Sequence, residues 1–316
     1  MFGKLKINNM KKKILITGGA GYKGVLLTDA LLKLNHEVTI LDNFMYGYES
    51  ILHLISNKNL TINKTDIRNL KQSDVDGFNV VYHLAGISGM PACATNPHSA
   101  ESINVDSVAK LIGFMKPEQL LINASTTSMY GFSDVICDEE TIISPVSIYG
   151  KTKFISENLI QARDNSISLR FATVFGVSPK MRNDLMVNDF TYKAIVDRSI
   201  ILFAGETKRT FIHINDAIRA YIFAMDNASI MKNNIYNVGD DSMNLSKIDI
   251  SNNIKKYVKF EIINSVLPDL DKRSFEISFK KINDIGFKTE YNLNDGILDL
   301  VKLYSFYVQY TPYKII

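Results

Sequence analysis

One feature constrains this chain more than any other: a short apolar run that leads directly into three regularly spaced glycines. The run KILIT covers residues 13–17, and Gly18, Gly21 and Gly24 follow it within the stretch TGGAGYKG. The first glycine permits a tight turn, the second lets the backbone approach an anion, and the third lets a helix pack closely on a strand. The pattern therefore predicts a strand, a turn and a helix whose N-terminus receives a pyrophosphate.

Apolar strand-like segments alternate with helix-like segments through the first half of the chain. After the first helix, expected over residues 22–35, strands are expected at 37–42, 79–85, 119–125 and 167–171, with helical stretches near 98–116 and 147–163. Continuously apolar strands between amphipathic helices indicate a parallel sheet that is covered on both faces. We therefore expect an α/β fold with a doubly wound (Rossmann) parallel sheet.

The regular alternation ends near residue 176. We expect a NAD-binding Rossmann domain over residues 13–176 and a smaller, mixed α/β region over residues 177–316 that binds the substrate. Parts of this second region are expected to return and pack on the first domain.

The composition excludes several classes of function. Formal net charge is only +3, which gives no reason to expect a nucleic-acid or membrane partner. The two cysteines, Cys93 and Cys137, have no CxxC or histidine partner at ligand spacing, so no metal site is expected. The sequence also shows no long apolar run and no signal-peptide pattern, and it predicts a soluble cytoplasmic protein.

Asp42 ends the second expected strand, where a carboxylate can accept hydrogen bonds from adenosine ribose hydroxyls and repels a 2′-phosphate. No Arg or Lys stands at Asn43, Phe44 or Met45. The cofactor is therefore expected to be NAD.

Lys23 is unusual because it is a long cation at the start of the helix that receives the pyrophosphate. Its ammonium can reach that negative charge or point to solvent. Of these two alternatives, the expectation favours solvent.

A second motif, YGKTK, places Tyr149 and Lys153 on one face at the start of a helical segment. A nearby ammonium stabilises a phenolate, so Tyr149 can serve as a base. A hydroxyl at the end of the preceding strand, in STTSMYG, can hold the same substrate oxygen. On chemistry alone, the candidates are Ser125, Thr126, Thr127 and Ser128.

These motifs, with DIR (66–68) and HLAG (83–86), together resemble the extended short-chain dehydrogenase/reductases. The most similar branch is the NAD-dependent epimerase/dehydratase family that acts on nucleotide sugars. The resemblance implies that Thr126 is the catalytic hydroxyl and that Tyr149 and Lys153 are the other catalytic residues. It implies cofactor contacts from these two residues and from Gly18, Gly21, Tyr22, Lys23, Gly24, Asp42, Asn43, Asp66, Ile67, Leu84, Ala85 and Gly86.

The mechanism that the resemblance implies is hydride transfer, with Tyr149 taking the proton of a sugar hydroxyl, usually at C4. Dehydratases of the family carry carboxylates directly after the catalytic hydroxyl. Thr127 and Ser128 stand there in this chain and cannot act as carboxylic acid or base, which argues against 4,6-dehydration.

The resemblance also implies a nucleotide diphosphate, GDP or UDP, bound by Arg209 and Arg273, since an arginine fork suits phosphate oxygens. A narrower branch, which includes GDP-heptose 4-dehydrogenases of capsule-sugar pathways, is resembled by three segments together: SPKMRNDLMVNDF (178–190), DNFMYG (42–47) and DKRSF (271–275). That likeness adds Arg182 and Asn188 as substrate contacts, and Ser88 is expected to border the sugar.

The sequence therefore predicts an NAD-dependent enzyme that oxidises C4 of a nucleotide-activated, GDP-heptose-like sugar, as a 4-dehydrogenase or as the first half of an epimerisation. A UDP-sugar 4-epimerase is one alternative. A non-catalytic NAD-binding regulator on the same scaffold is an alternative of another class. The family resemblance alone implies a homodimer.

Overall fold

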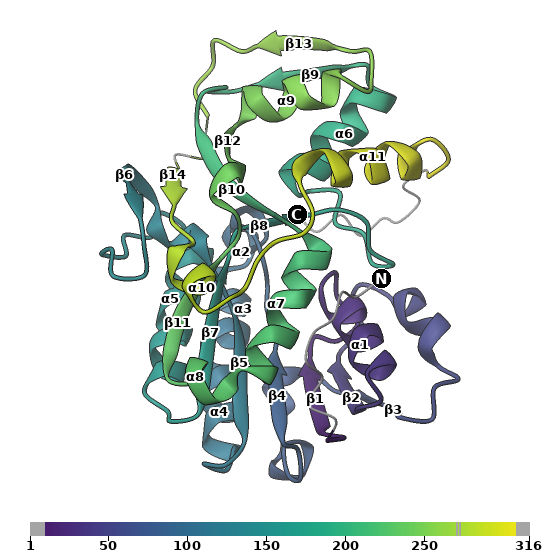
Figure 1. Ribbon diagram of the computed structural model, residues 1–316, viewed down its shortest axis with the longest axis vertical. Helices are drawn as coiled ribbons and strands as arrows, with labels where there is room; N and C mark the ends of the chain where they lie inside the picture. The colour runs from purple at the N-terminus through teal and green to yellow at the C-terminus, as the bar shows by residue number, and fades with distance from the viewer. Residues whose placement is uncertain (1–9, 270, 272, 308–316) are drawn as a thin grey trace.

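A computed structural model describes residues 10–269, 271 and 273–307. Among these residues, seven parallel strands form the central sheet, in the order β11-β7-β5-β4-β1-β2-β3 (Figure 1). Their bounds are β1 (Lys13–Thr17), β2 (Glu37–Asp42), β3 (Leu60–Lys64), β4 (Val80–His83), β5 (Leu120–Thr126), β7 (Ser166–Phe171) and β11 (Asn234–Val238). The expected doubly wound fold is confirmed.

Both faces of the sheet are buried, and strand alternation explains why the strands are apolar throughout. On β1, Ile14 and Ile16 join the core beneath α1 (Gly24–Lys33) and α7 (Ile214–Asp226), whereas Leu15 joins the core beneath α4 (Ser107–Phe114) and α5 (Ile148–Gln161). The helices therefore form one layer on each face.

A second, smaller core lies above the large sheet in Figure 1. It is built around α6 (Met186–Val196), α9 (Lys247–Lys255) and α11 (Leu293–Tyr304). Its strands are β8 (Thr173–Phe175), β10 (Lys208–His213) and β12 (Asn244–Ser246) in one sheet, and β9 (Ser199–Leu202) paired with β13 (Glu261–Asn264). Beside these, β6 (Phe132–Cys137) pairs with β14 (Ser274–Ile277). The short helices are α2 (Met90–Thr95), α3 (Pro97–Glu101), α8 (Ala228–Met231) and α10 (Lys280–Asp284).

The central sheet draws on both regions expected from the sequence. Strand β11 and helix α7 come from the second region, and β11 pairs in parallel with β7 through the register Tyr236 opposite Leu169. Part of the second region thus returns to the first and completes its central sheet.

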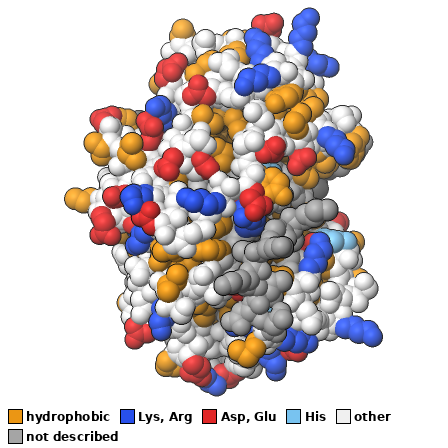
Figure 2. Space-filling model, viewed as in Figure 1, with side chains coloured by type: hydrophobic (Ala, Val, Ile, Leu, Met, Phe, Trp, Pro, Cys, Tyr) orange, Lys and Arg blue, Asp and Glu red, His pale blue; other side chains and the backbone are white. Residues whose placement is uncertain are grey.

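The surface fits the small net charge, since basic and acidic side chains are interspersed on the face seen in Figure 2. Within the described ranges, no helix has the length and apolar character needed to cross a membrane.

Candidate active site

The glycine turn between β1 and α1 is shaped by close backbone contacts. Gly18 has φ +73°, and a Cβ there would lie 2.7 Å from the backbone nitrogen of Ala85. A Cβ on Gly24 would lie 2.2 Å from the carbonyl oxygen of Gly18. Side chains at these two positions are therefore excluded, which leaves open backbone at the helix N-terminus for a pyrophosphate.

This turn lies where the order of the sheet reverses, because β1 is flanked by β2 on one side and by β4 on the other. In open α/β sheets, ligands bind at the carboxyl ends of the strands at such a point. The cleft found there is lined by Gly18, Gly21, Tyr22, Lys23, Gly24, Tyr46, Leu84, Ala85, Gly86, Ile87, Ser88, Ala124, Ser125, Tyr149, Lys153, Lys180 and Arg182.

Asp42 lies at the carboxyl end of β2, next to the glycine turn. Its Oδ2 accepts the backbone N–H of Ala20 (3.0 Å), and its Oδ1 accepts that of Phe44 (2.8 Å). Burial raises the pKa of this carboxyl despite these bonds. The residue is held at the expected strand end, and its role toward the ribose stays a prediction.

Asp66 caps the short helix that begins at the buried Ile67, and its carboxylate is held by Arg68. Arg68 donates from Nε (2.9 Å) and Nη2 (2.8 Å), and Asn43 adds a bond from Nδ2 (3.3 Å). The hydrogen bonds from Arg68 hold the pKa of Asp66 well below its usual range. Asp66, Ile67 and Asn43 thus lie together, outside the residues that line the cleft.

Tyr149 and Lys153 enter the cleft from the first turns of α5. This helix begins at Ile148, and the hydroxyl of the preceding residue, Ser147, accepts the backbone N–H of Gly150 (3.1 Å) as an N-terminal cap. Burial lowers the pKa of Lys153 to about 8, although the negative charge of Glu157 partly opposes that change. The phenol and the ammonium therefore face the same cleft as the glycine turn.

The end of β5 brings hydroxyl groups to this cleft. Ala124 and Ser125 line it, whereas Thr126 lies next to them, and its Oγ1 accepts the backbone N–H of Ser128 (3.1 Å). The assignment of Thr126 as the catalytic hydroxyl therefore stays a prediction. Ser125, which the residues alone left open, is the hydroxyl-bearing residue of this strand that lines the cleft.

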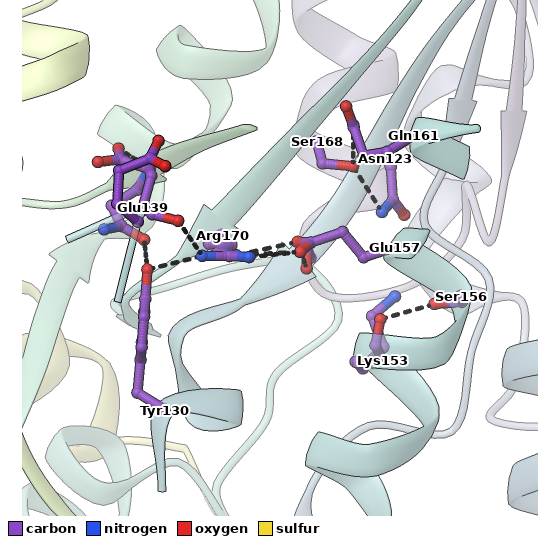
Figure 3. Close-up of polar contacts among 12 residues, drawn as sticks. Asn123, Tyr130, Glu139, Lys153, Ser156, Glu157, Gln161, Ser168 and Arg170 are labelled. Carbon is purple, nitrogen blue, oxygen red and sulfur yellow. Dashed lines mark hydrogen bonds and ion pairs between the residues drawn. The ribbon is translucent and has the colours of Figure 1, made fainter. Parts of the chain in front are cut away.

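A buried ion pair supports this end of β5. Figure 3 shows Arg170 between Glu157 and Tyr130. Its Nη2 lies 2.7 Å from Glu157 Oε1, and its Nη1 donates to the Tyr130 hydroxyl (2.8 Å). Ser125 donates to the other oxygen of Glu157 (2.6 Å). The pair thus ties α5, β5 and β7 together directly behind the cleft.

Lys23 does not point to solvent, and that expectation is wrong. Its Nζ lies 4.3 Å from the ring centre of Phe171 and 5.6 Å from that of Tyr221. The ring of Phe171 comes from the end of β7, and that of Tyr221 comes from α7. The ammonium group of Lys23 is therefore held by cation–π contacts with residues far along the chain.

Of the expected substrate residues, some line the cleft and others do not. Ser88 and Arg182 line the cleft, and Arg182 Nε donates to Asp184 (2.9 Å). Asn188 is fully buried, accepts the backbone N–H of Gly176 (3.0 Å) and donates to the Tyr22 hydroxyl (3.3 Å). These contacts give Asn188 a role in holding the loop after β8 against Tyr22.

Arg209 and Arg273 lie together and share one carboxylate, that of Asp271. Arg273 donates to it from Nε (2.8 Å) and Nη2 (2.6 Å), and Nη2 of Arg209 lies 3.1 Å from it. Arg273 also donates to the Ser128 hydroxyl (2.8 Å). The structure therefore brings the two arginines together and places Arg273 at the turn after β5, but neither arginine is among the residues that line the cleft.

The cleft contains four residues that the sequence reasoning did not single out, Tyr46, Ile87, Ala124 and Lys180. Lys180 Nζ donates to the backbone oxygen of Tyr46. Tyr46 belongs to the segment DNFMYG, and Lys180 belongs to SPKMRND. The only signal in the sequence is their chemistry, an aromatic ring and a cation in loops that follow strands.

Comparison with known proteins agrees with this geometry. An uncharacterised UDP-glucose epimerase, YtcB, of Bacillus subtilis is 32% identical over 66% of this chain and 70% of its own length. UDP-glucuronic acid decarboxylase 1 of Xenopus tropicalis is 29% identical over 68% of this chain and 54% of its own length, so the chain spans about half of that relative. The crystal structure of UDP-glucuronic acid 4-epimerase from Bacillus cereus, in complex with UDP-glucuronic acid and NAD, is similar with a TM-score of 0.79. It is 25% identical, and the match covers 93% of this chain and 99% of that one.

The family model described as NAD dependent epimerase/dehydratase family matches residues 14–239, from the first strand to the last strand of the central sheet. The dependence of the family on NAD confirms the expected cofactor. This chain belongs to the NAD-dependent epimerase/dehydratase family.

Proposed function

We propose that this protein uses NAD to oxidise C4 of a nucleotide-activated sugar, and that it either releases the 4-ketone or returns the hydride to the opposite face. The observation that carries the proposal is the meeting of Tyr149, Lys153 and the glycine turn in one cleft. NAD supplies the hydride acceptor when it is bound. Tyr149, as the phenolate that Lys153 stabilises, takes the hydroxyl proton and becomes the phenol. The Thr126 hydroxyl is proposed to hold the sugar oxygen, because the Ser125 hydroxyl already donates to Glu157.

The diphosphate of the substrate is proposed to bind at Arg209 and Arg273, beside the end of β5. Two guanidinium groups share a single carboxylate there, so the cluster carries excess positive charge toward an anionic ligand. The proposal does not include loss of water from the sugar. Thr127 donates to the backbone oxygen of Phe171 (3.2 Å), and Ser128 accepts from Arg273, so neither offers a carboxylic acid or base.

The finer substrate identity has two candidates. The sequence of residues 178–190 favours a GDP-heptose that is oxidised at C4. The B. cereus relative, which covers almost the whole chain, favours a UDP-sugar and epimerisation.

The experiment is incubation of the purified protein with UDP-glucose, UDP-glucuronate and GDP-heptose, with the products identified by mass spectrometry and NMR. Loss of two hydrogens identifies a dehydrogenase, and unchanged mass with inversion at C4 identifies an epimerase. Tyr149→Phe should lower turnover by about 10²- to 10⁴-fold while NAD still binds. Tyr192→Phe on α6 is the matched control and should keep turnover. Loss of water, or full activity of Tyr149→Phe, would contradict the proposal.

A further inference from the structure

Lys23 directs a second ammonium group into the cleft that holds Tyr149 and Lys153. It stands one residue before α1, and its side chain turns inward over Phe171 rather than outward. Both Lys23 and Lys153 line the cleft. The cation is therefore placed on the site from the α1 side, opposite the cation that α5 provides.

The charges around Lys23 are predominantly positive. Burial, followed by the charges of Lys153 and Arg182, lowers the pKa of Lys23 to about 7. Arg182 is paired with Asp184, which comes from the same loop. Within the described part of the chain, the ammonium groups of Lys23 and Lys153 form no ion pair or hydrogen bond with another side chain.

The remaining ionisable groups near Lys23 do not neutralise it. Tyr221 of α7 faces it with its ring, and the hydroxyl of Tyr221 has no hydrogen-bond partner among the described residues. Glu157 is the acidic group nearest in sequence to Lys153 on α5, and Arg170 and Ser125 already occupy its two oxygens. The excess positive charge is thus available to whatever occupies the cleft.

We propose that Lys23 is a second cation of the hydride-transfer site, which favours the uncharged reduced nicotinamide over the positively charged oxidised one. This inference rests on the proposed function. Oxidation of the sugar alcohol moves one proton to Tyr149 Oη and a hydride, which carries two electrons, to the nicotinamide ring. The charge of that ring changes from +1 to 0, which a cation in the same cleft favours, and Tyr149 regains its phenolate by releasing the proton to solvent.

The expected effect is large enough to measure. A unit charge several ångströms away, at an effective dielectric constant near 20, changes such an equilibrium by about tenfold or more. Lys23 should therefore bias the purified protein toward bound NADH.

The test compares Lys23→Met with Lys23→Arg, which restores the charge, and with Lys151→Met, which removes an exposed lysine from α5. Each protein is equilibrated with mixtures of NAD and NADH, and the bound cofactor is quantified after rapid desalting. Lys23→Met should lower the preference for NADH by about tenfold. Lys23→Arg and Lys151→Met should stay close to the unmodified protein.

An unchanged NADH preference in Lys23→Met would overturn the inference and leave the proposed function standing. A changed preference without oxidation of any nucleotide sugar would overturn the proposed function instead. If Lys23→Met fails to fold, Lys23→Gln is measured in the same way.

Discussion

Two clusters of arginine and carboxylate groups, one in each part of the molecule, differ in how completely their charges are paired. In the first, Arg170 and Glu157 are matched one to one, and their side chains are 4% and 0% exposed. In the second, Arg209 and Arg273 share Asp271, and the three side chains are 3%, 16% and 21% exposed. The Nε of Arg209 has no hydrogen-bond partner among the described residues. Removal of one partner from the complete pair leaves a buried charge uncompensated, whereas the shared carboxylate of the second cluster leaves one guanidinium charge unbalanced.

Replacing the carboxylate of the complete pair should have the largest effect on stability. In Glu157→Gln, the buried guanidinium of Arg170 loses its counter-charge, and Ser125 loses a charged acceptor. Removal of one partner from a buried pair costs about 3–5 kcal/mol. Chemical denaturation should show a loss of this size, and addition of UDP or GDP should not selectively offset it. A loss below about 1 kcal/mol would mean that water reaches the pair, as at an exposed site.

Replacing an arginine of the incomplete cluster should weaken substrate binding more than it weakens the fold. Arg273 is partly exposed, and its guanidinium is proposed to bind the diphosphate. Hydrogen bonds to charged groups contribute about 1.5–3 kcal/mol each. Arg273→Met should therefore raise KM by about 10- to 100-fold, with little change in kcat. Lys280→Met, at an exposed position on α10, is the control. An unchanged KM would remove Arg273 from the substrate site.

Removing the shared carboxylate should give a smaller effect of the opposite sign on binding. Burial by itself would raise the pKa of Asp271, but Arg273 and Arg209 hold it well below its usual range, so the carboxylate is charged near neutral pH. In Asp271→Asn, it no longer competes with a diphosphate for the two guanidinium groups. The rise in melting temperature on addition of UDP or GDP should exceed that of the unmodified protein, and Glu157→Gln should show no such gain. An equal rise in both would mean that Asp271, like Glu157, serves the fold alone.

The difference between these regions also explains what the sequence could predict. The first strand was expected at residues 13–17 and is found there, because an apolar run and a glycine turn are local patterns. The common face of Tyr149 and Lys153 follows from the spacing of residues in a helix.

Contacts between distant residues could not be predicted in this way. The direction of Lys23 is set by Phe171 and Tyr221, which come from strand β7 and helix α7 far along the chain. Similarly, no local pattern indicates that Asp271 is shared by two arginines, or that Asn188 bonds to Gly176 and Tyr22. Which partner a buried polar group takes depends on the packed fold, and a single sequence does not record it.

The two lysines of the cleft extend the comparison to cations with no anionic partner among the described residues, and they predict a modest dependence of stability on pH. The folded-state pKa values of Lys23 and Lys153 lie at about 7 and about 8, below the value of about 10.4 for an unfolded lysine. Between about pH 7 and about pH 10 the unfolded chain binds more protons, so the free energy of unfolding rises with pH. Asp271 gives a dependence of the same sign at lower pH, because its stabilising contribution is present above a pKa of about 3.9 and is lost as the pH falls further. Melting temperatures of the cofactor-free protein should therefore rise from about pH 6 to about pH 9 relative to a variant that carries both Lys23→Met and Lys153→Met. Parallel curves for the two proteins would show that these ammonium groups have water or an anion beside them in the folded state.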